Sequence, residues 1–379
     1  MKPAVSLANS AYGFYEVGEH WAFLNKADAL YKSSKYNKTI KWNFHNSIYS
    51  KFDWSQRPAG TLAELYRDRA QQIRDKYDYV RIDFSGGMDS WTVLHSFLSN
   101  NIHVDEVYTR WAFAERKYRD TNAINTNQEN LLSEYDYAVV PVLEHIRKNY
   151  PKTHVVVDDY SECFETDLTE KNLFDSNQYQ SLPTFFRFNR KSQYEQLAVK
   201  QGKSVAVVLG YEKIRCVVQD GNFYAHFIDR LGGTDSDLER TVELFYWSPD
   251  FPTIPILQAH CVKDYLVEHI AEFEHHTDYR KVYQPACYPD YNSQTFQVAV
   301  PVGSLIWDSD QWIRNYNPRY YNSWKWSTDQ YFNGIPTKHI SKNSNNEILG
   351  FTGMKSPMYL VEESVGIGNI DFFSINTSI

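Results

Sequence analysis

The stretch DYVRIDFSGGMDSWTVLHSFL, residues 78–98, carries the most informative pattern in the chain. It begins with a short β-prone run that stops at two glycines, Gly86 and Gly87. After the glycines, apolar residues return at three- and four-residue spacing, which is typical of a helix with one buried face. Because glycine permits sharp backbone turns, the stretch predicts a strand, a glycine loop and a helix in direct succession.

Strand and helix patterns continue to alternate on both sides of this stretch. Upstream, apolar residues at helical spacing predict an amphipathic helix from Thr61 to about Lys76. Downstream, β-prone runs occupy residues 104–109, 153–157 and 204–209, and helical patterns occupy 134–150 and 193–200. Strands that alternate with helices form a parallel sheet connected by right-handed crossovers. We therefore expect an α/β fold.

The pattern changes after this alternating part. The runs 215–218 and 223–228, separated by Asp220-Gly221, predict a β-hairpin on a type I′ turn. From about residue 231, Pro, Asn, Ser and aromatic residues dominate, apart from a helical pattern at 259–273. We expect an N-terminal extension with a covering helix at 1–77, a central domain at 78–230 and an irregular, aromatic-rich C-terminal region at 231–379.

Composition narrows the class of protein. The 379 residues have a formal net charge of −8, so the chain lacks the broad positive field that would follow nucleic-acid phosphates by electrostatics alone. No early apolar stretch and no run of eighteen apolar residues occurs, so we expect neither a signal peptide nor a membrane span. The four cysteines form no Cys-x-x-Cys pair, which argues against a disulfide framework and a cysteine zinc site and favours a cytoplasmic location.

The glycine loop has the chemistry of an anion site. Its glycines allow close approach of the backbone, and the amides that follow lie at the positive end of a helix dipole. The loop and first turn consist of Ser85, Gly86, Gly87, Met88, Asp89 and Ser90. The two serine hydroxyls can donate to phosphate oxygens, and Asp89 can hold Mg²⁺ against them. These residues predict a pyrophosphate group as ligand; a Gly-Gly turn with Asp89 and Ser90 capping the helix is the structural alternative.

The pattern Ser-Gly-Gly-x-Asp-Ser at residues 85–90 resembles the PP-loop signature of the ATP pyrophosphatase (adenine nucleotide α-hydrolase-like) superfamily. The resemblance implies a doubly wound, HUP or Rossmann-like parallel sheet and ATP and Mg²⁺ as cofactors. It also implies that ATP is split into AMP and pyrophosphate while a substrate oxygen is adenylated. A nucleophile, which we expect to be nitrogen, then attacks the activated substrate.

Further site residues follow from the resemblance and from the carboxyl ends of the expected strands, where open parallel sheets bind ligands. In several superfamily members a glycine followed by charged residues completes the site, which here matches Gly210, Glu212, Lys213 and Arg215. Lys213 and Arg215 are the expected catalytic residues that neutralise the triphosphate, and Glu212 is a candidate metal ligand beside Asp89. The alternative for this segment is a charged, solvated loop.

Two more residues end neighbouring strands. Thr109 and Asp158 lie at the same expected edge of the sheet and are candidates for contacts with the ribose or adenine. A carboxylate that ends a strand also serves simply as a turn former, and that alternative stays open for Asp158.

The wider layout, from about Leu62 to Lys263, resembles PP-loop proteins of tailed phages that are often described as phosphoadenylylsulfate-reductase-like. That resemblance implies a location in the host cytoplasm and a small molecule or nucleobase as the acceptor substrate. The net charge does not support a nucleic-acid partner, although the resemblance leaves one possible. An oligomer is also possible. Nothing after Cys287 is a cysteine, which disfavours sulfate reduction by a C-terminal thiol. A sulfur-transfer enzyme and a non-catalytic nucleotide-binding interaction protein remain the alternatives.

Overall fold

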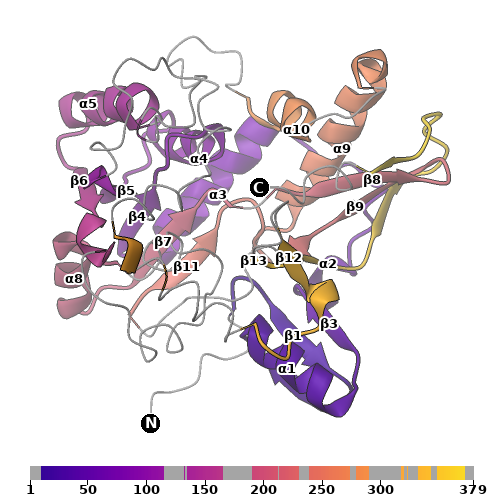
Figure 1. Cartoon of the computed structure of the whole chain (residues 1–379). Coiled ribbons are helices and arrows are strands. Elements are labelled where there is room, and N and C mark those ends of the chain that lie inside the picture. The colour runs from indigo at the N-terminus through magenta and orange to yellow at the C-terminus, as the bar shows by residue number, and fades with distance from the viewer. Residues whose placement is uncertain are drawn as a thin grey trace.

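The structure is a computed structural model of the whole chain (Figure 1). It describes residues 10–114, 132, 135–164, 190–211, 213–229, 239–273, 279–289, 317–319, 322, 332–342 and 348–371. All statements below concern these residues. No helix among them is long and apolar enough to cross a membrane.

A five-stranded sheet in which every neighbouring pair is parallel forms the centre of the fold, so the chain is an α/β protein. Its strands are β4 (Tyr79–Asp83), β5 (Glu106–Trp111), β6 (His154–Asp159), β7 (Val205–Leu209) and β11 (Thr241–Leu244). They lie in the order β11-β7-β4-β5-β6. The four strands expected from the sequence are confirmed, and β11 is an additional strand. The order runs from β4 through β5 to β6 in one direction and through β7 to β11 in the other.

Helices cover both faces of this sheet. Successive side chains of β4 point to opposite faces, and on each face they pack against helices. Val80, Ile82 and Phe84 belong to the main core, together with residues of α3 (Leu62–Lys76) and α4 (Met88–Leu98). Tyr79, on the other face, packs with Ala198 of α8 (Gln193–Lys200). The expected helix from Thr61 is confirmed, and Thr61 with Glu64 forms a capping box at its start.

A fourth helix follows β5 along the chain. The helix expected at 134–150 begins as a π-helical turn, Tyr135–Val139, and continues as α5 (Val140–Asn149). In Figure 1, α5 lies at the upper left, beyond α4 and next to β6.

The N-terminal part has its own small sheet, for which no sequence period was visible. It is antiparallel, with the order β2 (Trp21–Phe23), β1 (Phe14–Val17) and β3 (Ile40–Asn43), and α1 (Lys26–Tyr36) packs against it. The short helix α2 (Asn46–Tyr49) follows. Figure 1 shows this body at the lower right, away from the parallel sheet. The expected N-terminal extension thus contains an antiparallel sheet in addition to its covering helix.

The expected hairpin after residue 214 is confirmed. It consists of β8 (Arg215–Gln219) and β9 (Asn222–His226), and the turn residues Asp220 and Gly221 have φ values of 52° and 78°, both positive as a type I′ turn requires. In the described chain β15 (Tyr359–Glu362) and β16 (Ile370–Asp371) extend the hairpin to a four-stranded antiparallel sheet.

The C-terminal region is more regular than its composition indicates. The helix expected at 259–273 begins earlier, as α9 (Thr253–Glu268), and a 3₁₀ turn at Ile270–Glu272 follows it. The helix α10 (Tyr279–Cys287) packs on α9. Two further pairs are β10 (Ile228–Asp229) with β14 (Met354–Lys355), and β12 (Ile340–Lys342) with β13 (Ile348–Phe351).

These pairings cross the expected boundary at residue 230. β11 completes the parallel sheet from beyond that boundary, and β14, β15 and β16 pair with strands that precede it. The segments 78–230 and 231–379 are therefore interleaved within sheets.

A buried ion pair fastens α3 to the edge strand β11. Arg69 is fully buried, and its Nη2 donates to Glu243 Oε2 at 2.6 Å and to the Leu244 carbonyl at 3.3 Å. The other carboxylate oxygen of Glu243 accepts from Lys76 Nζ at 3.0 Å and from the Tyr77 hydroxyl at 2.5 Å. Burial by itself would raise the pKa of Glu243, but Arg69, Tyr77 and Lys76 outweigh it and hold the pKa below its usual 4.5.

Glu243→Gln is expected to lower the free energy of unfolding at neutral pH by about 3 kcal/mol, because it leaves the Arg69 guanidinium buried without its counter-ion. Since the folded pKa of Glu243 is depressed, its stabilisation is present above the unfolded value of 4.5 and is lost as pH falls through the folded pKa. The difference in the free energy of unfolding between wild type and Glu243→Gln should therefore become smaller at acid pH. Urea unfolding at a series of pH values measures it.

The control is Asp68→Asn, which removes an exposed ion pair with Arg67 in which both side chains are 49% exposed. It should cost less than about 1 kcal/mol at every pH. A gap for Glu243→Gln that stayed constant with pH would contradict the expectation.

Candidate functional site

The glycine loop lies at the carboxyl end of β4, beside β7, where the strand order reverses direction. Gly86 has a φ of +88°, a conformation that residues with a side chain rarely adopt. Ser85 is exposed and Ser90 is buried. The loop is therefore open to solvent at its start and anchored at its end.

Hydrogen bonds within the loop hold its shape. The Ser85 N–H donates to Ser90 Oγ at 3.1 Å, and the Ser90 hydroxyl donates to the Gly87 carbonyl at 3.0 Å. The hydroxyls of Ser85 and Ser90 also lie 3.1 Å apart. Ser90 is thus a structural brace, whereas the exposed Ser85 is the hydroxyl that a ligand can reach.

The first turn of α4 has no side-chain cap. Gly87 is the N-cap residue, no side chain accepts from the first amides, and the first helical bond runs from the Trp91 N–H to the Gly87 carbonyl at 3.0 Å. The amides of residues 88–90 precede that bond and face the positive end of the helix dipole. Because neither Asp89 nor Ser90 caps α4, the capping alternative does not describe this turn. The arrangement suits a phosphate.

The end of β7 lies directly against this turn. A Cβ added to Gly210 would lie 2.9 Å from the carbonyl carbon and oxygen of Asp89 and 3.0 Å from the Ser90 nitrogen. Glycine is therefore required at this position by the closeness of the two backbones. Three residues further on, the Lys213 ammonium pairs with Asp89 Oδ2. Gly210 and Lys213 are thus brought to the loop, as expected from the sequence.

Two tyrosines complete the surroundings of Asp89. The Tyr288 hydroxyl donates to Asp89 Oδ1, and the Tyr246 hydroxyl donates to the Asp89 carbonyl at 2.7 Å. Burial and the nearby Asp89 carboxylate raise the pKa of both tyrosines, so both stay protonated as donors. Tyr246 lies in an aromatic run that sequence alone could not distinguish from core, and Tyr288 has no motif around it.

Two expected site residues have other environments, and a third is not described. Thr109 is buried, and its hydroxyl accepts from Trp111 Nε1 at 2.8 Å. Arg215 begins β8, is buried, and its guanidinium carbon lies 5.0 Å from the centre of the Tyr279 ring. Among the described residues no hydrogen bond or ion pair joins either of these two residues to the loop. Glu212 lies outside the described residues.

Asp158 belongs to a charged cluster on the α8 face of the sheet. It pairs with the Arg190 guanidinium and accepts from the Tyr108 hydroxyl at 2.5 Å. Burial would raise the pKa of Asp158, but these hydrogen bonds outweigh it and hold the pKa below its usual value. Asp158 is more than a turn former, because it links β5, β6 and the segment before α8.

The groups around the loop, namely backbone amides and the Lys213 ammonium, suit a phosphate better than a metal ion. Both carboxylate oxygens of Asp89 are engaged by Lys213 and Tyr288. Among the described residues no group of three His, Cys, Asp or Glu side chains could hold a metal ion. Mg²⁺ usually binds one or two carboxylates together with the phosphates of its nucleotide. The described residues thus offer no support for Asp89 as a metal ligand.

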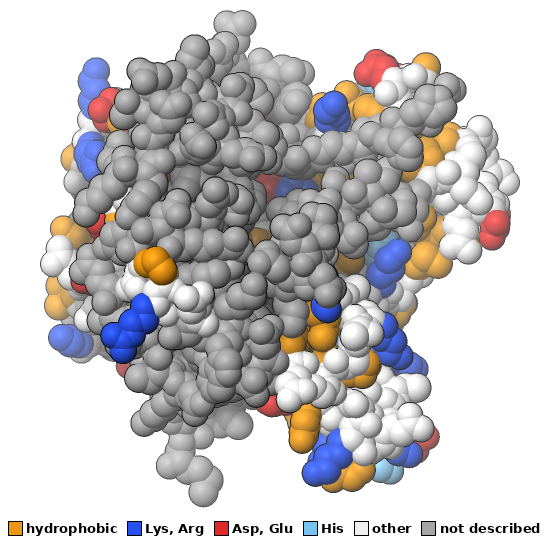
Figure 2. Space-filling model, in the orientation of Figure 1, with side chains coloured by type: hydrophobic (Ala, Val, Ile, Leu, Met, Phe, Trp, Pro, Cys, Tyr) orange, Lys and Arg blue, Asp and Glu red, His pale blue; other side chains and the backbone are white. Residues whose placement is uncertain are grey.

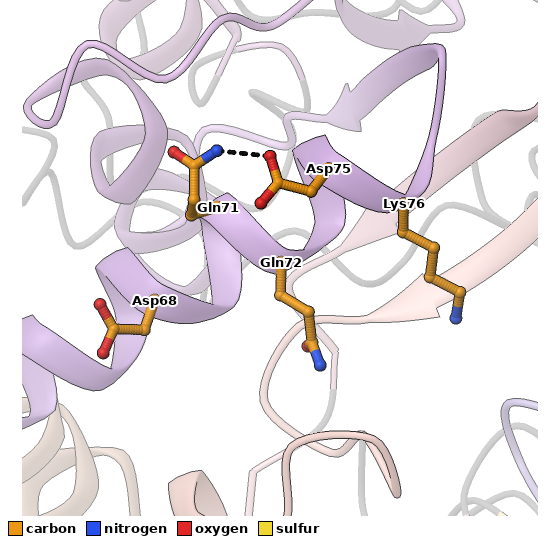
Figure 3. A pocket seen from close by; sticks show the side chains of 5 residues that line it. All are labelled: Asp68, Gln71, Gln72, Asp75 and Lys76. Atoms are coloured by element: carbon orange, nitrogen blue, oxygen red, sulfur yellow. Dashed lines mark hydrogen bonds between the residues drawn. The ribbon is translucent and has the colours of Figure 1, made fainter.

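A surface pocket lies on α3, lined by Asp68, Gln71, Gln72, Asp75 and Lys76. Figure 3 shows these side chains along a single helix, with Gln71 donating to Asp75 at 2.7 Å. Lys76 is near the amino end of β4, whereas the glycine loop follows its carboxyl end. Since all of its lining residues come from α3, this pocket is a weaker candidate for a ligand site than the glycine loop.

No protein-family model matches this chain, and no curated protein matches it either. The interpretation of the site therefore depends on its residues and their geometry.

The contact of Gly210 with α4 gives a direct test. Gly210→Ala is expected to lower the free energy of unfolding by about 1–3 kcal/mol, because the new methyl group meets backbone atoms that cannot rotate away. Gly368→Ala is the control: its Cβ would meet no atom within 4 Å, so it should change stability by less than about 0.5 kcal/mol. Equal stabilities of the two variants in urea unfolding would show that β7 and α4 are not in close contact.

Proposed function

We propose that this protein is an ATP pyrophosphatase that binds the outer phosphates of ATP at the loop 85–90 and releases pyrophosphate and AMP. The single observation that carries the proposal is the uncapped first turn of α4, whose amides follow a glycine loop that begins at the exposed Ser85. The motif and its position after a buried strand agree with the PP-loop interpretation.

The strand order supports a doubly wound, HUP or Rossmann-like sheet. β4 and β7 are neighbours, and the chain leaves them toward opposite edges of the sheet. In doubly wound folds this is the switch point, where ligands bind outside the carboxyl ends of the strands. The glycine loop follows β4, and Gly210 with Lys213 follows β7, so both lie at this switch point.

The residues at the loop suit cleavage between the α and β phosphates. The amides of residues 88–90 and the Ser85 hydroxyl would hold the pyrophosphate portion, and Lys213 would neutralise the negative charge that grows on it as it leaves. Transfer of AMP to a substrate oxygen turns that oxygen into a good leaving group for a nitrogen nucleophile. Mg²⁺ bound to the phosphates would supply further charge neutralisation.

The acceptor is most simply a small molecule or a single nucleobase. In Figure 2, described Lys and Arg side chains are scattered over the visible face, at the left, the upper right, the right side and the lower right. With a net charge of −8, this gives no added support for a long nucleic acid. Nothing in the described residues favours an oligomer, and location in the cytoplasm stays a proposal.

Sulfur transfer is the less favoured alternative. Burial raises the pKa of the Cys216 thiol to about 12 and raises that of Cys287 as well, and both side chains are fully buried. Cys261, in α9, also has a raised pKa because of burial. None of these three thiols has the lowered pKa of a reactive cysteine.

The test is product analysis with ATP labelled at the α or the γ phosphate, in the presence of Mg²⁺ and candidate acceptors. We expect labelled AMP and pyrophosphate from the wild type. Lys213→Ala should lower kcat about 100-fold, the loss typical of removing a preorganised group that stabilises charge in the transition state. Ser85→Ala should weaken ATP binding, whereas Ser99→Ala, an exposed serine at the other end of α4, should not.

Other products decide between the alternatives. ADP and phosphate would contradict the proposal. ATP that binds to the loop but stays intact would favour a non-catalytic nucleotide-binding protein.

A further inference from the structure

Asp89 is the meeting point of four chain segments that are far apart in the sequence. Its backbone touches Gly210 and accepts from Tyr246, and its carboxylate lies between Lys213 and Tyr288. Tyr288 directly follows α10, so it comes from the C-terminal region. That region therefore reaches the first turn of α4.

The arrangement solves an electrostatic conflict. A lone carboxylate in the first turn of α4 would repel a phosphate approaching the same amides. Pairing with Lys213 reduces that repulsion, and the ammonium donates one of its three N–H groups to Asp89, which leaves two for phosphate oxygens. The side chains are accessible, with 17% of Lys213 and 27% of Asp89 exposed.

Tyr288 determines which way the carboxylate faces. Its hydroxyl donates to Asp89 Oδ1, so Oδ2 is the oxygen that accepts from the Lys213 ammonium. The Tyr288 ring is itself held between two others, at 6.1 Å from the Tyr246 ring and 5.4 Å from the Tyr283 ring. Because Tyr288 is buried in this cluster, its hydroxyl has a fixed position.

We propose that Tyr288 is a positioning residue that acts through Asp89 to hold the Lys213 ammonium beside the glycine loop. The proposal rests on the proposed function, in which Lys213 neutralises the departing pyrophosphate. It makes the segment after α10 part of the nucleotide site. Tyr288 itself need not contact the nucleotide.

Tyr283 provides a matched control. It is fully buried next to Tyr288, and its hydroxyl has no hydrogen-bond partner among the described residues. Tyr283→Phe and Tyr288→Phe therefore each remove one hydroxyl from the same aromatic cluster, but only the second removes a hydrogen bond to Asp89.

Kinetics with ATP give the first readout. Tyr288→Phe should lower kcat about tenfold or more, the effect of losing a hydrogen bond to a charged group. KM for ATP should change less than about threefold, because the interaction acts on the transition state. Tyr283→Phe should keep wild-type kcat. Thermal unfolding of both variants checks that they are folded.

A double-mutant cycle separates positioning from a general structural role. In a Lys213→Ala background, Tyr288→Phe should cause no further loss of kcat, since its effect passes through Lys213. If Tyr288→Phe lowers kcat by the same factor in the Lys213→Ala background as in the wild type, the proposal is overturned.

A readout without nucleotide keeps the proposal separate from the proposed function. Reductive methylation with ¹³C-formaldehyde labels the lysines, and the Lys213 NMR signal is the one missing from Lys213→Arg. Tyr288→Phe should move this signal in the direction of Asp89→Asn, and Tyr283→Phe should leave it in place. If the wild type forms no AMP, the proposed function fails and this signal alone decides; an unmoved signal in Tyr288→Phe refutes the positioning role.

Discussion

The close contact between the end of β7 and the first turn of α4 is the constraint on which the candidate site depends. It exists because Gly210 has no side chain, so its backbone can lie against Asp89 and Ser90. The contact brings Lys213 within reach of the Asp89 carboxylate. The same turn is left without a side-chain cap, so its amides stay available at the edge of the sheet.

The C-terminal region is integral to the fold and to the candidate site. β11 extends the parallel sheet, and Glu243 on that strand holds α3 through Arg69. The chain then passes through α9 and α10 and returns to α4 at Tyr288. A truncated chain that ended near residue 230 would lack the edge strand and both tyrosine contacts to Asp89, since Tyr246 and Tyr288 come later.

The α8 face of the sheet is held by charges more than by apolar contacts. Arg81 is fully buried on β4, donates to Asp83 at 2.8 Å, pairs with Glu195 of α8, and lies 3.5 Å from the centre of the Tyr108 ring. Arg240 also pairs with Glu195, at 3.2 Å. A buried guanidinium needs such partners, because its desolvation cost is recovered only through good geometry. The network therefore fixes where α8 docks.

Local sequence determined the strands β4 to β7, the helix from Thr61, the type I′ turn and the glycine loop, because each depends on residue spacing or on the conformational freedom of glycine within a few positions. It also pointed to Gly210 and Lys213. Tertiary structure alone decided that Thr109 and Arg215 are buried, in contact with Trp111 and Tyr279, and that Tyr288 meets Asp89. Those outcomes depend on contacts between residues up to 199 positions apart, which no local period encodes.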